Sequence, residues 1–174
     1  GKGRDGWIQY MSGIGSGKDA HLFGDVILLD DAKTVSDAAY PWADKAANAL
    51  IGKGAISENY SGAKKLTAGE FAEILSKAMK IDMDKITYDG FEKDKTITRQ
   101  DMVVMLDKAC ADGTNADAEV LKAFLDNDKI SDYAVQSFAN MVAKGIIAGN
   151  GTMLYPQDDT VLAEAAVAVY NIIK

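Results

Sequence analysis

Two segments of the sequence follow the same ordered series of residues, which is typical of a helix that ends in a tight turn. Residues 42–54 and 133–145 each open with an aromatic residue followed by alanine, and each closes with a lysine–glycine pair. Each segment then runs into a polar loop that contains glycine, at residues 57–65 and 148–159. Such a repeat indicates supersecondary units that bury their apolar faces by packing against one another.

Apolar residues spaced by three and four positions predict helices along most of the chain. Pro41 suits the first position of the first helix, and Gly52 suits its end. The predicted helices span residues 41–52, 67–80, 98–111, 117–125, 131–144 and 161–173. No stretch alternates long enough for a large sheet, so the predicted fold class is all-α.

The inward faces of these helices define a predicted core. In the first helix, Trp42, Ala46, Ala49 and Leu50 fall on one face. Elsewhere, the residues expected to be largely buried are Phe71, Ile74, Leu75, Met102, Met105, Val142, Val169 and Ile172. Each unit alone has too few apolar residues to bury a core. The sequence therefore predicts three pseudo-repeats of helix, loop and helix that pack around a common core.

Two of the predicted helices begin with a threonine that is followed three residues later by an acid. These pairs are Thr67 with Glu70 and Thr98 with Asp101. At this spacing the threonine oxygen accepts a hydrogen bond from the third N–H, and a glutamate can reach back to the threonine N–H. A helix-capping role explains all four residues without any ligand.

The chain divides into a glycine-rich segment at residues 1–35 and a helical region at residues 36–174. We expect the first segment to be irregular, with one short strand at residues 25–29, or to be the end of a preceding domain. The helical region divides into units of about 36–80, 81–115 and 116–174. The middle unit is too short for its first helix, and the segment around Trp7 is a candidate to cover the gap. Because the chain begins with Gly1, we expect it to be part of a longer protein.

The charge balance argues against two classes of partner. The chain has 19 basic and 26 acidic residues, which gives a formal net charge of −7. A nucleic-acid binder or a protein that docks on anionic membranes needs a surplus of positive charge, so we expect neither partner. Cys110 and His21 are each the only residue of their type, so no metal site is expected. No catalytic motif is complete, and no cofactor is expected.

The ordered set of motifs resembles the S-layer homology family of bacterial surface anchors. The motifs that carry the resemblance are Trp42-Ala43, Lys53-Gly54-Ala55-Ile56, Ile97-Thr98-Arg99-Gln100-Asp101, Lys144-Gly145-Ile146-Ile147 and Val161-Leu162-Ala163-Glu164. Of three arginines in the family pattern only Arg99 is present, because Ala68 and Leu162 occupy the other two positions. Val161 replaces the capping threonine of the last unit, so we expect Thr160 or Asp159 to cap that helix.

The resemblance implies a noncatalytic, secreted module at the bacterial cell surface that binds an anionic secondary cell-wall polysaccharide, often one with pyruvate ketals. Arg99 is the candidate for a ligand carboxylate, because a guanidinium can bind it with two parallel hydrogen bonds. Its place in the first turn of a helix also favours an anion. The other candidate polysaccharide-binding residues are Trp42 and Tyr133 for sugar rings, Gly54 and Gly145 for close backbone approach, and Lys53 and Lys144 for charge.

Each of these candidate residues also has a structural interpretation. The aromatic residues can anchor the core, the glycines can end helices, and the lysines can simply be solvated. Two alternatives to the anchoring function therefore remain open. One is a degenerate domain of the same fold that serves as a structural or interaction module without glycan binding. The other is an enzyme. The sequence identifies neither the sugar nor the oligomeric state.

Overall fold

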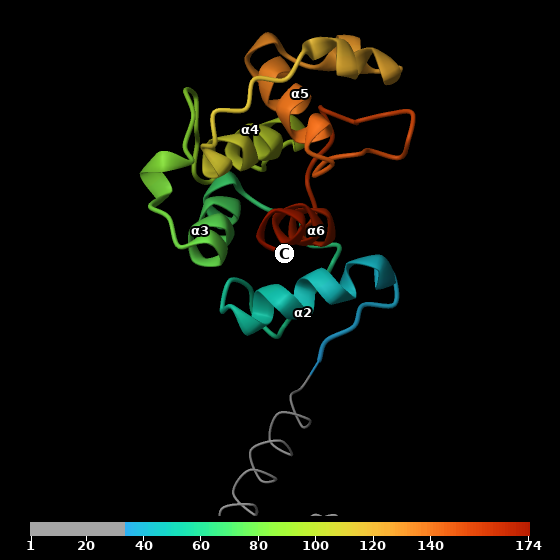
Figure 1. Ribbon diagram of the computed structural model, residues 1–174. Helices are drawn as coiled ribbons and strands as arrows, with labels where there is room; N and C mark the ends of the chain where they lie inside the picture. The colour runs from blue at the N-terminus through green and yellow to red at the C-terminus, as the bar shows by residue number, and fades with distance from the viewer. Residues whose placement is uncertain (1–33) are drawn as a thin grey trace, which may run out of the picture. The chain divides into compact units, whose positions relative to one another are not determined.

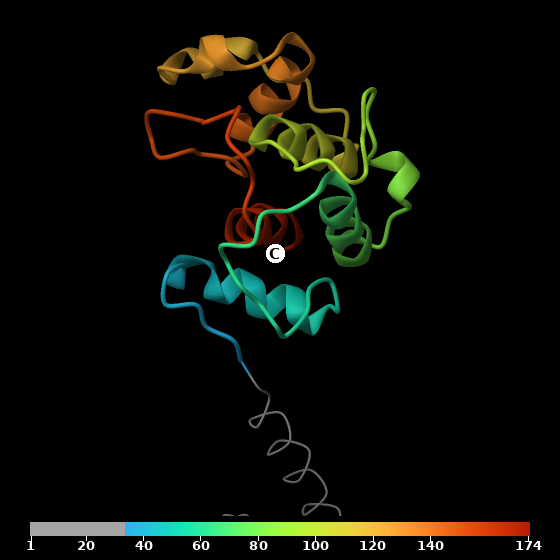
Figure 2. The ribbon, with the colours of Figure 1, turned by 180° about the vertical axis from the view of Figure 1, so that it is seen from behind.

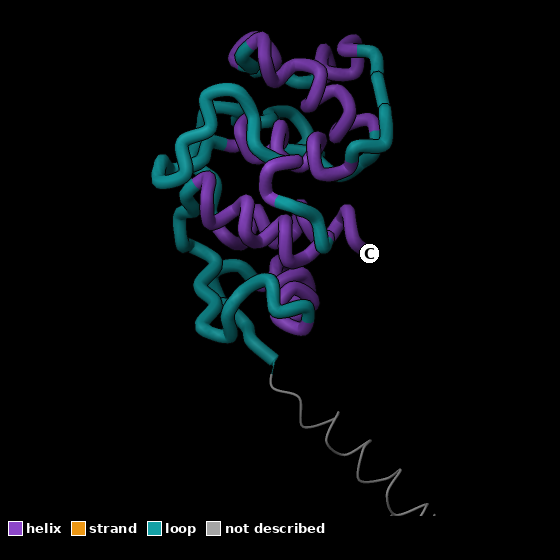
Figure 3. The backbone as a smooth tube through the Cα atoms, turned by 90° about the vertical axis from the view of Figure 1, so that its left-hand side faces the viewer, coloured by secondary structure: helices purple, strands orange, loops and turns teal. Residues whose placement is uncertain are grey.

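The computed structural model describes residues 34–174. Its α-helices are α2 (Asp44–Gly52), α3 (Ala68–Met79), α4 (Arg99–Cys110), α5 (Val135–Ala143) and α6 (Leu162–Ile173). Short 3-10 helices are η1 (Pro41–Ala43), η2 (Met83–Lys85), η3 (Ala118–Ala123), η4 (Asn127–Lys129) and η5 (Asp132–Ala134). Long loops join these helices, and residues 34–174 contain no strand, so the all-α prediction is confirmed (Figure 3).

Helix α6 lies at the centre of this helical region. It packs against α2 on one side and against α3 and α4 on the other, while α5 and η3 pack together beyond α4 (Figures 1 and 2). The predicted helices are all present at nearly the expected bounds, but residues 118–123 form a 3-10 helix where a short α-helix was expected, and the first turns of the predicted helices 41–52 and 131–144 are the 3-10 helices η1 and η5. The expected strand at residues 25–29 and the segment around Trp7 lie outside the described residues.

Three segments that precede helices meet in a closed ring of backbone hydrogen bonds. The N–H of Leu66 donates to the Thr160 carbonyl, that of Thr160 to the Ile97 carbonyl, and that of Ile97 to the Leu66 carbonyl, at 3.2, 3.0 and 2.9 Å. Because these residues immediately precede α3, α6 and α4, the ring places the three helix starts in equivalent positions around one centre.

The first N–H groups of each of these helices are also bonded to the backbone of a neighbouring loop. In α4 the N–H groups of Arg99 and Gln100 donate to the carbonyls of Asp158 and Pro156, at 2.8 and 2.9 Å. The corresponding donors are Ala68 and Gly69 in α3 and Leu162 and Ala163 in α6. These bonds satisfy donors that a helix start otherwise leaves unpaired.

Helix α6 begins without a side-chain cap, so the prediction that Thr160 or Asp159 caps it is wrong. The Thr160 side chain is fully buried in the core, and the Asp159 carboxylate pairs with Lys65 at 2.8 Å. Neither oxygen accepts from the first turn of α6, whose N–H groups on Leu162 and Ala163 are already bonded to backbone carbonyls.

The core forms where the inward faces of α3, α4, α5 and α6 meet. Of the residues predicted to be buried, Phe71, Ile74, Leu75, Met102, Met105 and Val169 are buried, while Val142 and Ile172 are only half-buried. Trp42 is 56% exposed, which contradicts its place on the inward face. It lies in the 3-10 helix η1, whose tighter winding breaks the α-helical periodicity on which the prediction rested.

The middle of the chain lacks a long helix between α3 and α4, as its length predicted. Only the short helix η2 is present there, and Ile86, which follows it, is fully buried. Tyr88 comes next, and its ring stacks on Tyr133 with 6.3 Å between ring centroids and 6° between ring planes. The short connection between α3 and α4 thus packs an aromatic side chain against η5.

Candidate functional site

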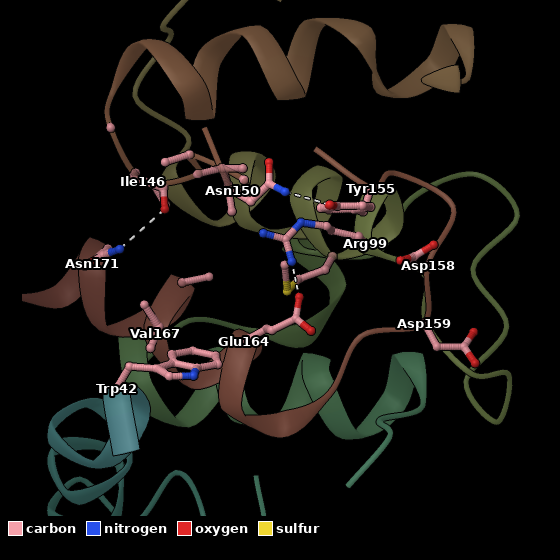
Figure 4. A pocket seen from close by; sticks show the side chains of 16 residues that line it. Trp42, Arg99, Ile146, Asn150, Tyr155, Asp158, Asp159, Glu164, Val167 and Asn171 are labelled. Atoms are coloured by element: carbon pink, nitrogen blue, oxygen red, sulfur yellow. Dashed lines mark hydrogen bonds and ion pairs between the residues drawn. The ribbon is translucent and has the colours of Figure 1, made fainter. Parts of the chain in front are cut away.

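A groove of about 580 Å³ lies beside the start of α4, and we call it the Arg99 groove (Figure 4). Four parts of the chain line it: η1 through Trp42, the first turn of α4 through Arg99, the loop of residues 145–159, and α6 through Glu164. The groove therefore exists only because residues far apart in sequence are brought together around the central ring.

Arg99 is the first residue of α4, and its side chain is 15% exposed. One terminal nitrogen, Nη1, donates to the Glu164 carboxylate (Figure 4). The Nε atom is buried and has no hydrogen-bond partner within residues 34–174. The guanidinium therefore has one buried donor, Nε, that no described residue uses. The backbone N–H groups at the helix start are not available to an anion, because Asp158 and Pro156 already accept from them.

Two aromatic side chains lie at the rim of the Arg99 groove. Trp42 contacts Tyr40 edge to face, with 5.8 Å between ring centroids, and leaves much of its ring exposed. Tyr155, from the loop, is 38% exposed and has a backbone φ of +54°. In Figure 4 the two rings lie on opposite sides of the Arg99–Glu164 pair. An exposed ring face of this kind can bind the apolar face of a sugar.

Gly145 lines the groove and also ends helix α5. Its N–H donates to the Val142 carbonyl, and the next N–H, of Ile146, donates to the Met141 carbonyl. This pair of bonds is the Schellman motif, which favours glycine at a positive φ, here +70°. Gly54 ends α2 in the same way. The helix-ending interpretation therefore holds for both glycines.

The other proposed polysaccharide-binding residues lie outside the Arg99 groove. Gly54 lines a second groove of about 390 Å³, together with Lys64, Glu70 and Leu162. Lys53 is exposed at the end of α2 and lines neither groove. Lys144 forms an ion pair with Asp112 at 2.7 Å, and the adjacent ammonium holds the pKa of the Asp112 carboxyl well below its ordinary value.

Tyr133 also lies away from Arg99, in a network of polar side chains at the start of α5. Its hydroxyl donates to the Asp101 carboxylate and accepts from the Gln100 amide at 3.0 Å. Burial and the hydrogen bond to Asp101 raise the pKa of Tyr133. Burial and the Asp101 charge likewise raise the pKa of Tyr88, on which it stacks. Tyr133 is therefore hydrogen-bonded and stacked within the protein, although half of its surface is exposed.

The threonine–acid pairs cap their helices, but in two different ways. Thr67 and Glu70 form a reciprocal capping box, with bonds of 3.2 and 3.0 Å. Hydrogen bonds from Lys64 and from the Thr67 N–H lower the pKa of Glu70. Thr98 accepts from the Asp101 N–H and also donates its own hydroxyl to that carboxylate, at 2.9 Å. The shorter aspartate side chain bonds the hydroxyl rather than the Thr98 N–H.

Most residues that line the Arg99 groove were not predicted from the sequence, among them Glu164, Tyr155 and Asn150. Glu164 could have been found, because it stands third in α6, where Glu70 stands in α3 and Asp101 in α4. Nothing in the sequence marks Tyr155 or Asn150, because their place in the groove depends on the path of the loop.

The comparison with known protein families matches residues 123–166 to the S-layer homology domain. The matched segment contains α5, the whole groove-lining loop and the first turn of α6. A comparison with curated proteins found no matching relative. Within residues 34–174, no helix has the length and apolar character needed to cross a membrane. Residues 123–166 are therefore similar to the S-layer homology domain, a family that generally anchors proteins to cell-wall polymers.

Proposed function

We propose that the Arg99 groove binds an anionic secondary cell-wall polysaccharide that carries pyruvate ketals, and that the chain thereby attaches a secreted protein to the bacterial cell wall. The single observation that carries this proposal is the position of the Arg99 guanidinium. It lies in a groove with an exposed tryptophan, and its Nε donor has no partner among the described residues. A ligand carboxylate that shares or replaces Glu164 as the acceptor can also satisfy this donor if the side chains around the buried Nε move aside.

The charges around Arg99 set a condition on this binding. Glu164 already accepts from Nη1, and Asp158 also lines the groove, whereas Asp159 is paired with Lys65. A ligand carboxylate must therefore share the guanidinium with Glu164 or displace it. This competition favours weak or moderate affinity at the groove, so firm attachment needs several chains or further binding modules on one polymer.

The acidic residues that line the groove also support one alternative function. If Glu164 is a permanent partner of Arg99, the domain is a degenerate member of the family that serves a structural or interaction role. The groove then needs no anion, and the ion pair only joins α4 to α6. Polysaccharide binding by the wild-type protein separates the two functions.

The hydrogen-bond ring supports a second part of the proposal, which concerns domain organisation. We propose that residues 36–174 are one domain of three units, at about 36–80, 81–115 and 116–174. The family match covers part of the third unit. The equivalent backbone bonds at the starts of α3 and α4 support the view that the other two units are diverged copies of it.

The test is a binding assay with polysaccharide purified from a bacterial cell wall, before and after mild acid removal of its pyruvate ketals. Arg99→Ala should weaken binding about ten- to a hundredfold. The reason is that loss of a partly desolvated pair of hydrogen bonds between a guanidinium and a carboxylate costs about 1.5–3 kcal/mol. Arg99→Lys should restore binding only in part, because the planar geometry is lost.

Lys53→Ala is the matched control, because it removes a positive charge that lies in neither groove. It should bind as the wild type does. Equal binding by wild type and Arg99→Ala contradicts the role of the guanidinium. Failure of the wild type to bind favours the degenerate domain.

A further inference from the structure

Tyr155 adopts a backbone conformation that its residue type disfavours. Its φ of +54° lies in the left-handed region, where a side chain other than glycine, asparagine or aspartate costs free energy. Two other non-glycine residues within 34–174, Lys80 and Ala111, share this region, but each directly follows a helix and ends it. Tyr155 ends no helix. Strain without a capping role is a reason to look for function.

A buried carboxylate holds Tyr155 in this conformation. Asp126, which is 5% exposed, accepts from the Tyr155 N–H at 2.7 Å and from the Leu154 N–H at 2.9 Å. On the other side, the Pro156 carbonyl accepts from the Gln100 N–H in the first turn of α4. The backbone of Tyr155 is thus tied to the protein interior on one side and to the helix that carries Arg99 on the other.

The orientation of the Tyr155 hydroxyl is also fixed. The Asn150 amide donates to the phenol oxygen at 2.6 Å. The amide cannot turn the other way round, because its oxygen already accepts from the Thr152 N–H and from the Met153 N–H, at 3.0 and 2.9 Å. The phenol oxygen is therefore an acceptor from Asn150. No described residue accepts the phenol's own hydrogen, which leaves it free for another group.

We propose that Tyr155 is a ligand-contacting residue of the Arg99 groove, in which its ring packs on a sugar and its hydroxyl donates to an oxygen of the same polymer. This inference rests on the proposed function, and it adds a second specific contact between the groove and the glycan. Trp42 and Tyr155 then contact the glycan from opposite sides of Arg99 (Figure 4). The strained backbone is what directs the phenol towards the groove.

The test measures binding of the same pyruvylated polysaccharide and the melting temperature, Tm, for three variants. Tyr155→Asn removes the ring, and asparagine tolerates the left-handed region. We expect it to weaken binding at least about tenfold, with a Tm within about 2 °C of wild type, because relief of strain offsets lost packing. Tyr155→Phe keeps the ring and should weaken binding roughly three- to tenfold. Lys80→Asn is the control with the same backbone conformation, and it should bind as wild type.

The outcomes separate this inference from the function on which it rests. Binding by both Tyr155 variants at the wild-type level, while Arg99→Ala loses binding, overturns the inference and leaves the proposed function standing. A lower Tm for Tyr155→Asn together with unchanged binding by Tyr155→Phe also overturns it, because Tyr155 is then only structural. No binding by the wild type overturns both. Weaker binding by Tyr155→Phe with an unchanged Tm supports it.

Discussion

Glu164 is the residue that decides how strongly the Arg99 guanidinium attracts an anion. It accepts from Arg99 within the groove, and its side chain is 34% exposed. Glu164→Gln keeps an acceptor of the same shape and removes the negative charge. If the ligand is anionic, we expect this change to tighten binding about two- to fivefold, which corresponds to roughly 0.5–1 kcal/mol after solvent screening.

Glu73→Gln is the control for this measurement, because Glu73 lies in the second groove and faces no arginine. It should leave the affinity unchanged. Weaker binding by Glu164→Gln would mean that Glu164 contacts the ligand directly or that the ligand is not an anion.

Thr160 carries a polar atom that the core does not satisfy. Its hydroxyl is fully buried and has no hydrogen-bond partner among the described residues, whereas the ring positions equivalent to it hold Leu66 and Ile97. Thr160→Val replaces the hydroxyl with a methyl group of similar size. We expect it to raise the free energy of unfolding by about 1 kcal/mol, measured by urea denaturation.

The same substitution at Thr67 should act in the opposite direction. Thr67→Val removes the oxygen that accepts from the Glu70 N–H, and loss of a helix cap costs about 1 kcal/mol. If Thr160→Val lowers the free energy of unfolding instead, the Thr160 hydroxyl has a hydrogen-bond partner and the prediction is wrong.

At the scale of single elements, α2 ends with two glycines that have different backbone conformations. Gly52 is the last helical residue, and Gly54 has a φ of +69°. An added Cβ meets no atom within 4 Å at either position. Gly52→Ala should therefore stabilise the protein by about 0.5–1 kcal/mol, and Gly54→Ala should destabilise it by about 1 kcal/mol. Thermal unfolding of the two variants, compared with wild type, tests the prediction, and a shift of the same sign in both would contradict it.

The helices could be predicted from the sequence because each has a local signal. The apolar periodicity of α3 and α4 and the threonines before them define both their bounds and their inward faces. Trp42 was misplaced because a 3-10 turn changes the direction of a side chain without changing the sequence pattern. Val142 and Ile172 were misplaced because periodicity gives a face of the helix but not how far the neighbouring helices extend over it.

The site could be predicted only in part, because it depends on contacts between distant segments. Arg99, Trp42 and Gly145 were found from motifs and do line one groove. Tyr133 and Lys144 are the counterparts of Trp42 and Lys53 in the repeat. However, Tyr133 is hydrogen-bonded to Asp101, and Lys144 is paired with Asp112. A repeat in sequence predicts equivalent backbones, but it does not predict which side chains remain free to bind a ligand.

At the scale of the whole domain, the central ring relates three first helical residues: Ala68 in α3, Arg99 in α4 and Leu162 in α6. Only one of these positions has a guanidinium. The second groove has Leu162 there, and its described lining has no aromatic residue. The third position has Ala68, and the aromatic side chain of Tyr133, the counterpart of Trp42 in the repeat, is bonded to Asp101 and stacked on Tyr88. Of the three related positions, only that of Arg99 thus combines a guanidinium with an exposed aromatic residue in one groove.

This asymmetry predicts a single glycan site in each chain. Calorimetric titration with a short pyruvylated fragment of the wall polymer, too short to bridge two proteins, should give one fragment bound per chain. Affinity should fall as salt rises from low to high ionic strength, because the contact is between charges at a partly exposed groove. Arg99→Ala should weaken the affinity about ten- to a hundredfold, as in the assay with the whole polymer. Two or three fragments per chain, or binding by Arg99→Ala with the affinity of the wild type, would mean that the second groove or the Tyr133 surface also binds the polymer despite the loss of its arginine.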